Sequence, residues 1–460
     1  MHRDPGSFKD PAGAIYMHDG RVFRSVTSAG LATFEAVRET GLLDVLVERG
    51  MLVPYTVVAA PDAPQIAGAE VVLEHPRIAH ISYPYEWSFS MLRAAALFHL
   101  DVQLEALDHG VMLSDATAYN IQFDGVTPAF IDHLSFRPYV DGEYWIAHRQ
   151  FCEQFVCPLL LRHYRGIAHN SWYRGELHGI PLEATAALLP VKAKLSWNVL
   201  THVVAQARLQ AGGERTRAQA AKKDRKLPRS ALRNMWLGLR TWLTKMRIPD
   251  SPTTWSDYAE NTSYSDEQTR AKAEFVRDFV ASEGPEVVCD LGCNTGAYAA
   301  VALAAGARRV IGYDADHGAL EGAFERAQSH NLAFTPLYLD ATNPPSNQGW
   351  NEEERSGFSA RADAGAILAL ALIHHLAIAN NVPLDEVVGW LVSLAPRGVL
   401  EFVPKSDPMV RELLRLREDI FIDYDEAAFV QAVERRATIT ARHSFADGGR
   451  LLIAFARHAA

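Results

Sequence analysis

Cysteine is scarce in this 460-residue sequence, which contains only Cys152, Cys157, Cys289 and Cys293. Four thiols cannot form a disulfide framework in a chain of this length, and neither pair has companion ligands at the spacing of a zinc site. Long apolar runs are scarce too, because no uncharged apolar run reaches the roughly 20 residues that span a bilayer. The first residues also lack the apolar stretch of a signal peptide. We therefore expect a protein of the reducing cytoplasm with no transmembrane segment.

Basic residues are fewer than acidic ones, 45 against 55, which gives a net charge of −10. Residues 211–250 nevertheless carry +8, so the remainder carries −18. An acidic body argues against general nucleic-acid binding. Within the basic segment, residues 231–247 have the spacing of an amphipathic helix whose apolar face includes Trp236 and Trp242. We expect this helix to pack on a domain, and peripheral contact with a membrane surface is the alternative.

The length and composition indicate at least two folded domains. Hydrophobic residues make up 48% and charged residues 22% of the sequence, which is ordinary for globular proteins. Single cores stop growing near roughly 250–300 residues. Because the chain turns polar and basic after residue 210, we expect a domain at 1–209, a basic linker and helix at 210–254, and a second domain at 255–460. The sequence carries no indication of the oligomeric state.

The N-terminal domain has the pattern of an α+β fold, in which a small β-rich part precedes helices. A turn at His18–Gly20 between apolar runs predicts a hairpin over residues 12–26. Helical periodicity then covers residues 31–46, with an interruption at Gly41. Further strands are expected at 55–59, 70–73 and 79–83, a long helix at 88–108, and helices with breaks near Gly166 and Pro181 at 151–209.

The C-terminal domain alternates helix and strand after Thr269, which predicts a parallel, doubly wound α/β sheet. Its first strand ends in Asp290 and runs into a turn that contains Gly292, Asn294 and Gly296, followed by a helix. Glycine lets the backbone approach a ligand closely, and a helix N-terminus favours polar or negative groups. A nucleotide-like ligand is therefore expected at this turn.

Two later strands also end in acids. Asp314 closes the second strand 24 residues after Asp290, a spacing at which a carboxylate can accept hydrogen bonds from ribose hydroxyls. Asp340 closes a third strand, expected at 337–340. These acids could instead cap helices. The glycine turn alone also fits a dinucleotide, but a carboxylate before its first glycine would repel a pyrophosphate and suits the cationic amino group of S-adenosylmethionine.

On these residues, the segment 255–460 resembles the class I S-adenosylmethionine-dependent methyltransferases, and the layout of the whole chain resembles the nodulation-protein-like bacterial methyltransferases. The resemblance implies a Rossmann-like fold with S-adenosylmethionine as cofactor. It places the turn Asp290–Gly296 on the methionine side, Asp314 at the ribose and Asp340 near the adenine amino group. Tyr264, ahead of the first strand, is a candidate for closing over the cofactor.

Side chains at the ends of the next two strands are candidates for contact with the methyl acceptor. One strand leads into His374 and His375, and the other contains Glu401. Either histidine could accept a proton from the acceptor, since its ordinary pKa is about 6.5. Alternatively, the two histidines simply pack at a helix start. Methyl transfer from a sulfonium needs mainly alignment, so a general base is not required.

Three polar residues of the N-terminal domain follow the order of a protein-kinase catalytic segment. Asp115, Asn120 and Asp132 stand where the base, the metal-binding Asn and the metal-binding Asp are expected. The segment resembles protein-kinase-like and aminoglycoside-phosphotransferase folds, which implies Mg²⁺ and ATP as further cofactors.

The same domain lacks the parts that position phosphates. It has no glycine-rich loop, and Lys9 is its only lysine before residue 191, so Arg21 or Arg24 would have to replace the nucleotide-binding lysine. Three interpretations stay open: a turn-rich hairpin whose side chains cap backbone groups, a kinase-like fold without phosphoryl transfer, and an active phosphotransferase. We expect the second, because positioning and charge neutralisation are most of phosphoryl-transfer catalysis.

The expected function is methyl transfer from S-adenosylmethionine to an unidentified acceptor, with a small molecule or a glycan favoured. The N-terminal domain would then aid acceptor recognition. One alternative is a bifunctional kinase-methyltransferase that phosphorylates a glycan or hydroxyl and methylates it. Another is a protein that binds S-adenosylmethionine without catalysis. The acceptor cannot be named, because its binding site has no transferable sequence code.

Overall fold

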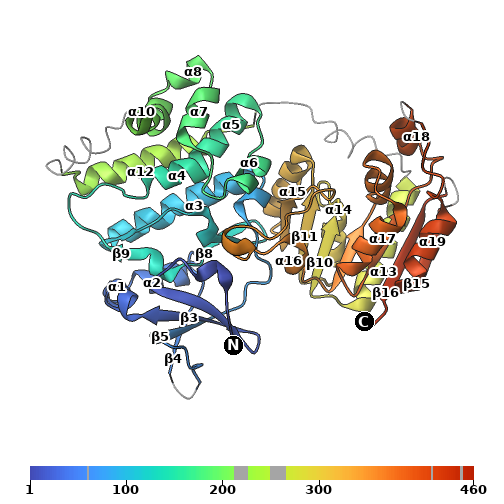
Figure 1. The fold of residues 1–460 in the computed structure, drawn as a ribbon, viewed down its shortest axis with the longest axis horizontal. Coiled ribbons are helices and arrows are strands. Elements are labelled where there is room, and N and C mark those ends of the chain that lie inside the picture. The colour runs from blue at the N-terminus through green and yellow to red at the C-terminus, as the bar shows by residue number, and fades with distance from the viewer. Residues whose placement is uncertain (60–61, 212–225, 249–265, 416–417, 446–448, 460) are drawn as a thin grey trace. The chain divides into compact units, whose positions relative to one another are not determined.

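The computed structural model describes residues 1–59, 62–211, 226–248, 266–415, 418–445 and 449–459 (Figure 1). Tyr264 and most of the basic linker lie outside the described residues. The chain divides into two compact units, the first made of 1–123, 127–250 and 347–355, the second of 124–126, 251–346 and 356–460. Within the described part of the chain, no helix combines the length and the apolar character needed to cross a bilayer.

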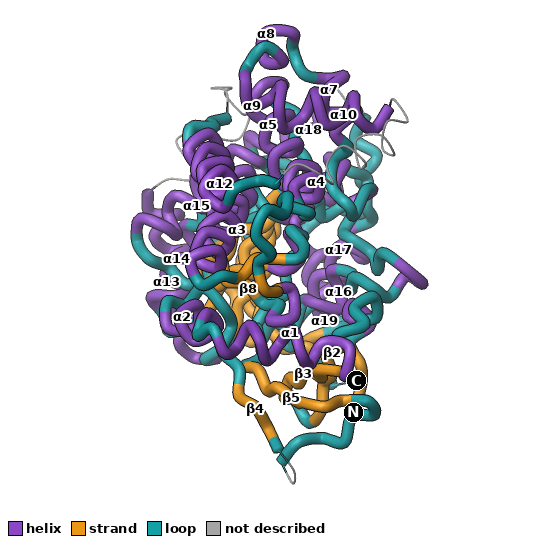
Figure 2. The backbone as a smooth tube through the Cα atoms, turned by 90° about the vertical axis from the view of Figure 1, so that its left-hand side faces the viewer, coloured by secondary structure: helices purple, strands orange, loops and turns teal. Residues whose placement is uncertain are grey.

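The first unit begins with an antiparallel sheet in the order β1-β2-β3-β5-β4. Its strands are β1 (His2–Arg3), β2 (Gly13–His18), β3 (Arg21–Thr27), β4 (Thr56–Val58) and β5 (Ala69–His75). β2 and β3 form the predicted hairpin. Helices α1 (Ser28–Glu39) and α2 (Leu42–Glu48) follow, separated by Gly41 at a φ of 75°, as the interrupted periodicity predicted. Figure 2 shows α1 lying against this sheet.

The strand predicted at residues 79–83 is absent from the structure. Ser82 exchanges two backbone hydrogen bonds with the side-chain amide of Gln122, at 2.9 and 3.0 Å, in place of a neighbouring strand. Pro84 then begins a short 3₁₀ turn, Pro84–Glu86. The prediction was wrong because a side chain from a distant segment satisfies backbone groups that local alternation assigned to a sheet.

The rest of the first unit is mainly helical. The long helix α3 (Phe89–Asp108) begins after Ser88, whose hydroxyl accepts a hydrogen bond from the N–H of Met91. Two short strand pairs follow, β6 (Val111–Leu113) with β9 (Phe136–Pro138) and β7 (Ile121–Asp124) with β8 (Thr127–Phe130). The later helices are α4 (His148–Phe151), η5 (Cys152–Val156), α5 (Cys157–Arg165), α6 (Asn170–Gly175), α7 (Leu182–Leu188), α8 (Val191–Lys194), α9 (Trp197–Val199), η6 (Leu200–Val204) and α10 (Ala205–Ala211).

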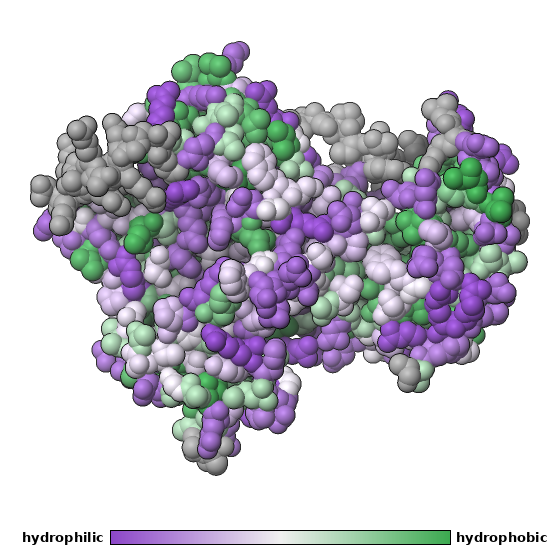
Figure 3. Space-filling view, in the orientation of Figure 1, coloured by the Kyte–Doolittle hydropathy of each residue, from purple (hydrophilic) through white to green (hydrophobic). Residues whose placement is uncertain are grey.

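The basic helix α12 (Arg229–Thr244) packs on this unit by its apolar face. Trp236 is fully buried, and its ring centroid lies 5.6 Å from that of Trp145. On its polar side, Arg240 pairs with Asp101 of α3 at 2.5 Å. The predicted packing role is confirmed, and the apolar face considered for membrane contact is covered by the first unit itself. Figure 3 shows hydrophobic surface elsewhere on this unit, over α8.

The second unit contains a seven-stranded sheet in the order β12-β11-β10-β13-β14-β16-β15. Its strands are β10 (Val287–Leu291), β11 (Arg309–Asp314), β12 (Phe334–Tyr338), β13 (Ala366–Ala369), β14 (Arg397–Phe402), β15 (Ala437–Ser444) and β16 (Leu451–Arg457). The first five strands of that order are parallel, as predicted. β16 is antiparallel to both of its neighbours, β14 and β15, which the sequence pattern did not predict. β12 ends at Tyr338, so Asp340 lies two residues beyond the strand and does not close it.

Helices cover both faces of this sheet. Val310 and Val399 belong to the core formed with α13 (Asp266–Glu283), α14 (Ala297–Ala304) and α15 (His317–Ser329). Tyr313, three residues beyond Val310 and therefore on the other face, contacts Phe358 at a centroid distance of 5.2 Å. That face carries α16 (Phe358–Arg361), α17 (Leu384–Ser393) and α19 (Glu426–Glu434), and the connections include η9 (His375–Ala379) and α18 (Pro408–Leu414). The unit is a Rossmann-like α/β fold.

Candidate functional site

The strand order changes direction between the hydrogen-bonded neighbours β10 and β13. From β10 the chain adds β11 and β12 toward one edge of the sheet, and from β13 it adds β14 toward the other edge. Ligands of open α/β sheets bind beyond the carboxyl ends of the strands at such a switch point. Asp290 lies near the carboxyl end of β10, and Asp314 is the last residue of the adjacent strand β11. The fold therefore brings these two predicted residues to one edge.

The predicted glycine turn follows β10. Gly292 and Gly296 have φ values of 78° and 79°, and Asn294 between them has a φ of 49°. A Cβ atom on Gly296 would lie 2.3 Å from Cε1 of Phe334, so only glycine fits there. The turn thus keeps the start of α14 close to the sheet and leaves its backbone near the strand ends.

Asp314 organises the same turn. Its carboxylate accepts hydrogen bonds from the backbone N–H groups of Asn294 and Asp316, each at 2.8 Å. Burial raises the pKa of Asp314, although these N–H groups act in the opposite direction. The acid is thus fixed at the strand end by backbone donors.

Asp290 is the most deeply buried of the three strand-end acids. It is 2% exposed, and its Oδ2 has no hydrogen-bond partner among the described residues. Burial, followed by the nearby charge of Asp314, raises the pKa of Asp290 to about 7, while Lys272 acts to lower it. A buried carboxylate with an unpaired oxygen is costly unless a donor or cation meets it.

Asp340 is half-buried and serves a local turn. Its Oδ1 accepts hydrogen bonds from the backbone N–H of Thr342 at 2.9 Å and from the Thr342 hydroxyl at 2.6 Å. Its carboxylate therefore stabilises the turn after β12, in addition to any ligand contact.

Glu401 lies in a buried ionic network. Its Oε2 pairs with Nζ of Lys272 at 2.6 Å and accepts the N–H of Ala371 at 2.9 Å, and its Oε1 lies 3.5 Å from Arg450. Arg450 in turn pairs with Asp407 at 2.6 Å. Burial lowers the pKa of Lys272, against the opposing effect of Glu401. The network holds two cations and two acids, so it is neutral by itself.

The contact with Ala371 connects this network to the loop that carries the two histidines. Ala371 has a φ of 52°, a strained value for a residue with a Cβ atom, and Glu401 holds its N–H. His374 is 1% exposed, and its ring nitrogens have no hydrogen-bond partner among the described residues. Burial lowers the pKa of His374 far below its ordinary value and also lowers that of His375, so both rings are neutral.

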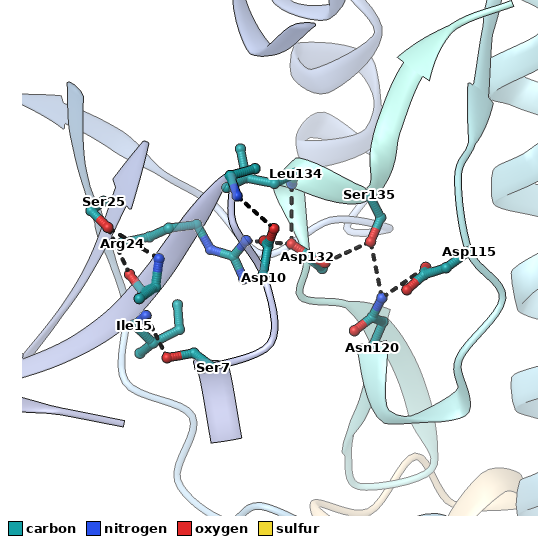
Figure 4. Close-up of polar contacts among 12 residues, drawn as sticks. Ser7, Asp10, Ile15, Arg24, Ser25, Asp115, Asn120, Asp132, Leu134 and Ser135 are labelled. Carbon is teal, nitrogen blue, oxygen red and sulfur yellow. Dashed lines mark hydrogen bonds and ion pairs between the residues drawn. The ribbon is translucent and has the colours of Figure 1, made fainter. Parts of the chain in front are cut away.

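The kinase-like residues of the first unit also come together, as Figure 4 shows. The Asn120 side chain donates to Asp115 Oδ1 at 3.2 Å and to the Ser135 hydroxyl at 3.0 Å. Ser135 donates in turn to Asp132 at 2.5 Å. Asp132 also receives a charged hydrogen bond from Arg24 of β3.

These neighbours shift the pKa values of Asp115 and Asp132 in opposite directions. Burial acts to raise the pKa of Asp132, but Arg24, Ser135 and the N–H of Leu134 outweigh it and hold the pKa below its usual value. Burial and the charge of Asp132 raise the pKa of Asp115 to about 7. Asp132 is therefore the ionised member, and its charge is neutralised by Arg24.

Sequence reasoning missed the partners of Glu401. Lys272 shares the buried stripe of α13 with Val276, Phe279 and Val280. A lysine four residues before Val276 on an apolar stripe is a signal for a buried ion pair, although the partner cannot be identified from spacing. Arg450 and Asp407 gave no comparable signal.

Comparison with known proteins finds a relative along nearly the whole chain. The nodulation protein NoeA of Rhizobium meliloti (strain 1021) is 45% identical over 464 residues, which cover 99% of this chain and 96% of that protein. No family model matches the chain.

Similar solved structures include two methyltransferases. N-methyltransferase NodS from Bradyrhizobium japonicum WM9, in complex with S-adenosyl-L-homocysteine, is 13% identical, covers 45% of this chain and 99% of its own, and has a TM-score of 0.32. Magnesium protoporphyrin IX methyltransferase from Synechocystis PCC 6803, with bound S-adenosylmethionine, is 17% identical, covers 45% and 86%, and has a TM-score of 0.30.

Proposed function

The chain belongs to the family of the nodulation protein NoeA, and from this premise and the strand-end acids we propose that it is an S-adenosylmethionine-dependent methyltransferase. The name of NoeA states a biological setting and no reaction. The choice of cofactor therefore depends on the chemistry of the strand ends. The supporting fold is the Rossmann-like α/β sheet that the resemblance to class I methyltransferases implies.

The observation that carries the proposal is the pair of acids Asp290 and Asp314. Asp290 is buried and Asp314 is partly buried, burial raises the pKa of each, and the neighbouring Lys272 already pairs with Glu401. Such a site favours a ligand with positive charge and disfavours a pyrophosphate. S-adenosylmethionine carries an ammonium and a sulfonium group and supplies the methyl group when bound.

The roles of the chain's residues follow from their positions. Asp290 would receive the cofactor's ammonium group, Asp314 its ribose hydroxyls and Asp340 its adenine amino group. Gly292, Asn294 and Gly296 would let the backbone approach the methionine end. Tyr264 stays a candidate for covering the cofactor.

On the acceptor side, His374 and His375 follow the strand next to β10. A neutral imidazole can accept a proton, so either ring is a candidate base for an acceptor within hydrogen-bond reach, although burial makes both rings weaker bases than an exposed histidine. Glu401, held by Lys272 and Ala371, is better suited to positioning their loop than to touching the acceptor. The acidic body of the chain favours a small molecule or a glycan over nucleic acid as acceptor.

Transfer of the labelled methyl group of S-adenosylmethionine into host-cell extract, separated into glycan, lipid, small-molecule and protein pools, tests the function. We expect label in the glycan pool or the small-molecule pool. Binding of S-adenosylmethionine without label in any pool would favour a non-enzymatic binding protein. Tight NAD binding without S-adenosylmethionine binding would overturn the proposal.

Replacement of Asp314 tests the cofactor site directly. We expect Asp314→Ala to lose on the order of 1.5–3 kcal/mol of binding energy for S-adenosylmethionine, since hydrogen bonds to a charged group are removed. Calorimetry measures this, with Glu325→Ala on the exposed side of α15 as the matched control. Equal affinities of Asp314→Ala and wild type would remove Asp314 from the site.

A second candidate function is phosphoryl transfer by the first unit. The observation that favours it is the raised pKa of Asp115, about 7, which suits a general base near neutrality. Against it, Arg24 occupies the carboxylate of Asp132 that would hold Mg²⁺. We therefore propose a kinase-like unit that aids acceptor recognition without efficient transfer.

Incubation with Mg²⁺, labelled ATP and the acceptor pool decides between the two functions of this unit. We expect no phosphate in the acceptor, and no difference between wild type and the isosteric variant Asp115→Asn. Label that enters the acceptor and disappears in Asp115→Asn would establish the bifunctional enzyme instead.

A further inference from the structure

Three potential metal ligands that are not part of the Asp115 network meet in the helical part of the first unit. They are His148 of α4, Cys152 at the start of η5 and His202 of η6. Nε2 of His148 lies 2.8 Å from Nδ1 of His202 and 3.6 Å from Sγ of Cys152. The three ligand atoms all lie within 4.8 Å of one another.

The backbone that presents these ligands is unusual. Both η5 and η6 are π-helical, and single π turns inside helices occur frequently at functional sites. His148 and Cys152 are four residues apart, so they lie on one side of their helix. His202 comes from a segment 50 residues later, so the three groups converge only through the fold.

The distance between Cys152 and His148 agrees with zinc geometry, and the other two distances would have to adjust. A tetrahedral ion with bonds of about 2.3 Å to sulfur and 2.05 Å to nitrogen separates those two atoms by about 3.6 Å, the distance observed between Cys152 and His148. Two imidazole ligands would be about 3.3 Å apart, so the two histidine nitrogens would have to separate by about half an ångström. That change needs only small rotations of the rings.

The surroundings also suit a cation of this kind. The rings of Trp145 and Trp242 lie 5.5 Å and 6.3 Å from the rings of His148 and His202 and give the site an apolar shell. Cys152 is fully buried, whereas the two histidines are partly exposed, which leaves a path for the ion.

We propose that His148, Cys152 and His202 bind one Zn²⁺ ion, with a water molecule as fourth ligand. The S–H bond of Cys152 breaks, a sulfur–zinc bond forms and the proton leaves to solvent. The ion would join the π turn after α4 to the π turn before α10.

Cobalt titration of the full chain, after treatment with a chelator and its removal, tests the site. We expect one Co²⁺ to bind with tetrahedral visible absorption and a thiolate charge-transfer band, and Zn²⁺ to displace it. Calorimetry in buffers of different ionisation enthalpy should detect one released proton per ion. Zinc should also raise the melting temperature of wild type.

Two variants and one control make the assignment specific. Cys152→Ser should lose the charge-transfer band, and His202→Ala should weaken Zn²⁺ binding by about 100-fold or more. Cys157→Ser, which removes a buried thiol five residues away, should bind like wild type. A thiolate band that survives in Cys152→Ser, equal losses in Cys157→Ser, or no binding by wild type would each overturn the proposal.

Discussion

Glu401→Gln is expected to destabilise the second unit by about 3–5 kcal/mol, because it removes one charge of a buried ion pair and leaves the other behind. Lys272 is 2% exposed and Glu401 is fully buried, so water cannot replace the lost partner. The variant would leave Lys272 with Asp290 as its acidic neighbour and Arg450 paired with Asp407. The expected loss is large for a unit whose total stability is of the order of 5–15 kcal/mol.

The measurement should report on the second unit alone, since a chain of two units need not unfold in one step. Urea-dependent hydrogen exchange of peptides from β13 and β14 does so in the full-length protein. Asp385→Ala is the matched control, because its ion pairs lie at the surface, with Arg435 exposed and Arg436 partly exposed, and exposed pairs contribute about 0–1 kcal/mol.

A double variant separates a broken ion pair from a general loss of packing. Lys272→Met combined with Glu401→Gln removes both charges, so it should be more stable than Glu401→Gln alone. If the two effects add instead, the stability comes from packing and the ionic account of this network is wrong.

The sequence predicted the strand-end acids because their position is a local property. An apolar strand followed by an acid and glycines can be read directly, and parallel strands must place their carboxyl ends at one edge. Asp290 and Asp314 were found in this way. Asp340 was placed too close to its strand, because β12 ends at Tyr338 and the polar turn after it belongs to no strand.

Other features depend on contacts that no local pattern contains. Gln122 takes the place of a strand partner for Ser82, and Lys272 meets Glu401 across 129 positions of the sequence. The cluster of His148, Cys152 and His202 depends on the fold in the same way, because His202 lies 50 residues after Cys152 in the sequence. Arg24 was considered as a replacement for the nucleotide-binding lysine, and only the fold shows that it pairs with Asp132.

The affinity for S-adenosylmethionine should rise with pH through the titration of Asp290. Burial and Asp314 raise the pKa of Asp290 to about 7, so the carboxyl is mostly protonated at pH 5 and half ionised at pH 7. A cationic ligand prefers the ionised form. Since an α-amino group keeps its proton below about 7.7, the ligand's charge is nearly constant over this range, and affinity should rise up to about 50-fold between pH 5 and pH 7.

The same shift has the opposite sign for stability without ligand. A carboxyl whose folded pKa exceeds its unfolded value binds more protons in the folded state. The contribution of Asp290 to the free energy of unfolding therefore falls as pH rises from about 4 to 7. Tighter binding at higher pH thus cannot be attributed to a more stable fold at this position.

Asp290→Asn should remove both trends, because an amide resembles the protonated carboxyl and does not titrate. Calorimetry at half-unit steps from pH 5 to 7 should give a flat affinity for the variant that meets the wild-type curve near pH 5 and lies below it at pH 7. Glu325→Ala should keep the wild-type slope. A flat wild-type profile, or an equal slope in Asp290→Asn, would show that the cation does not meet Asp290, and the amino-group contact would then have to be assigned to another acid.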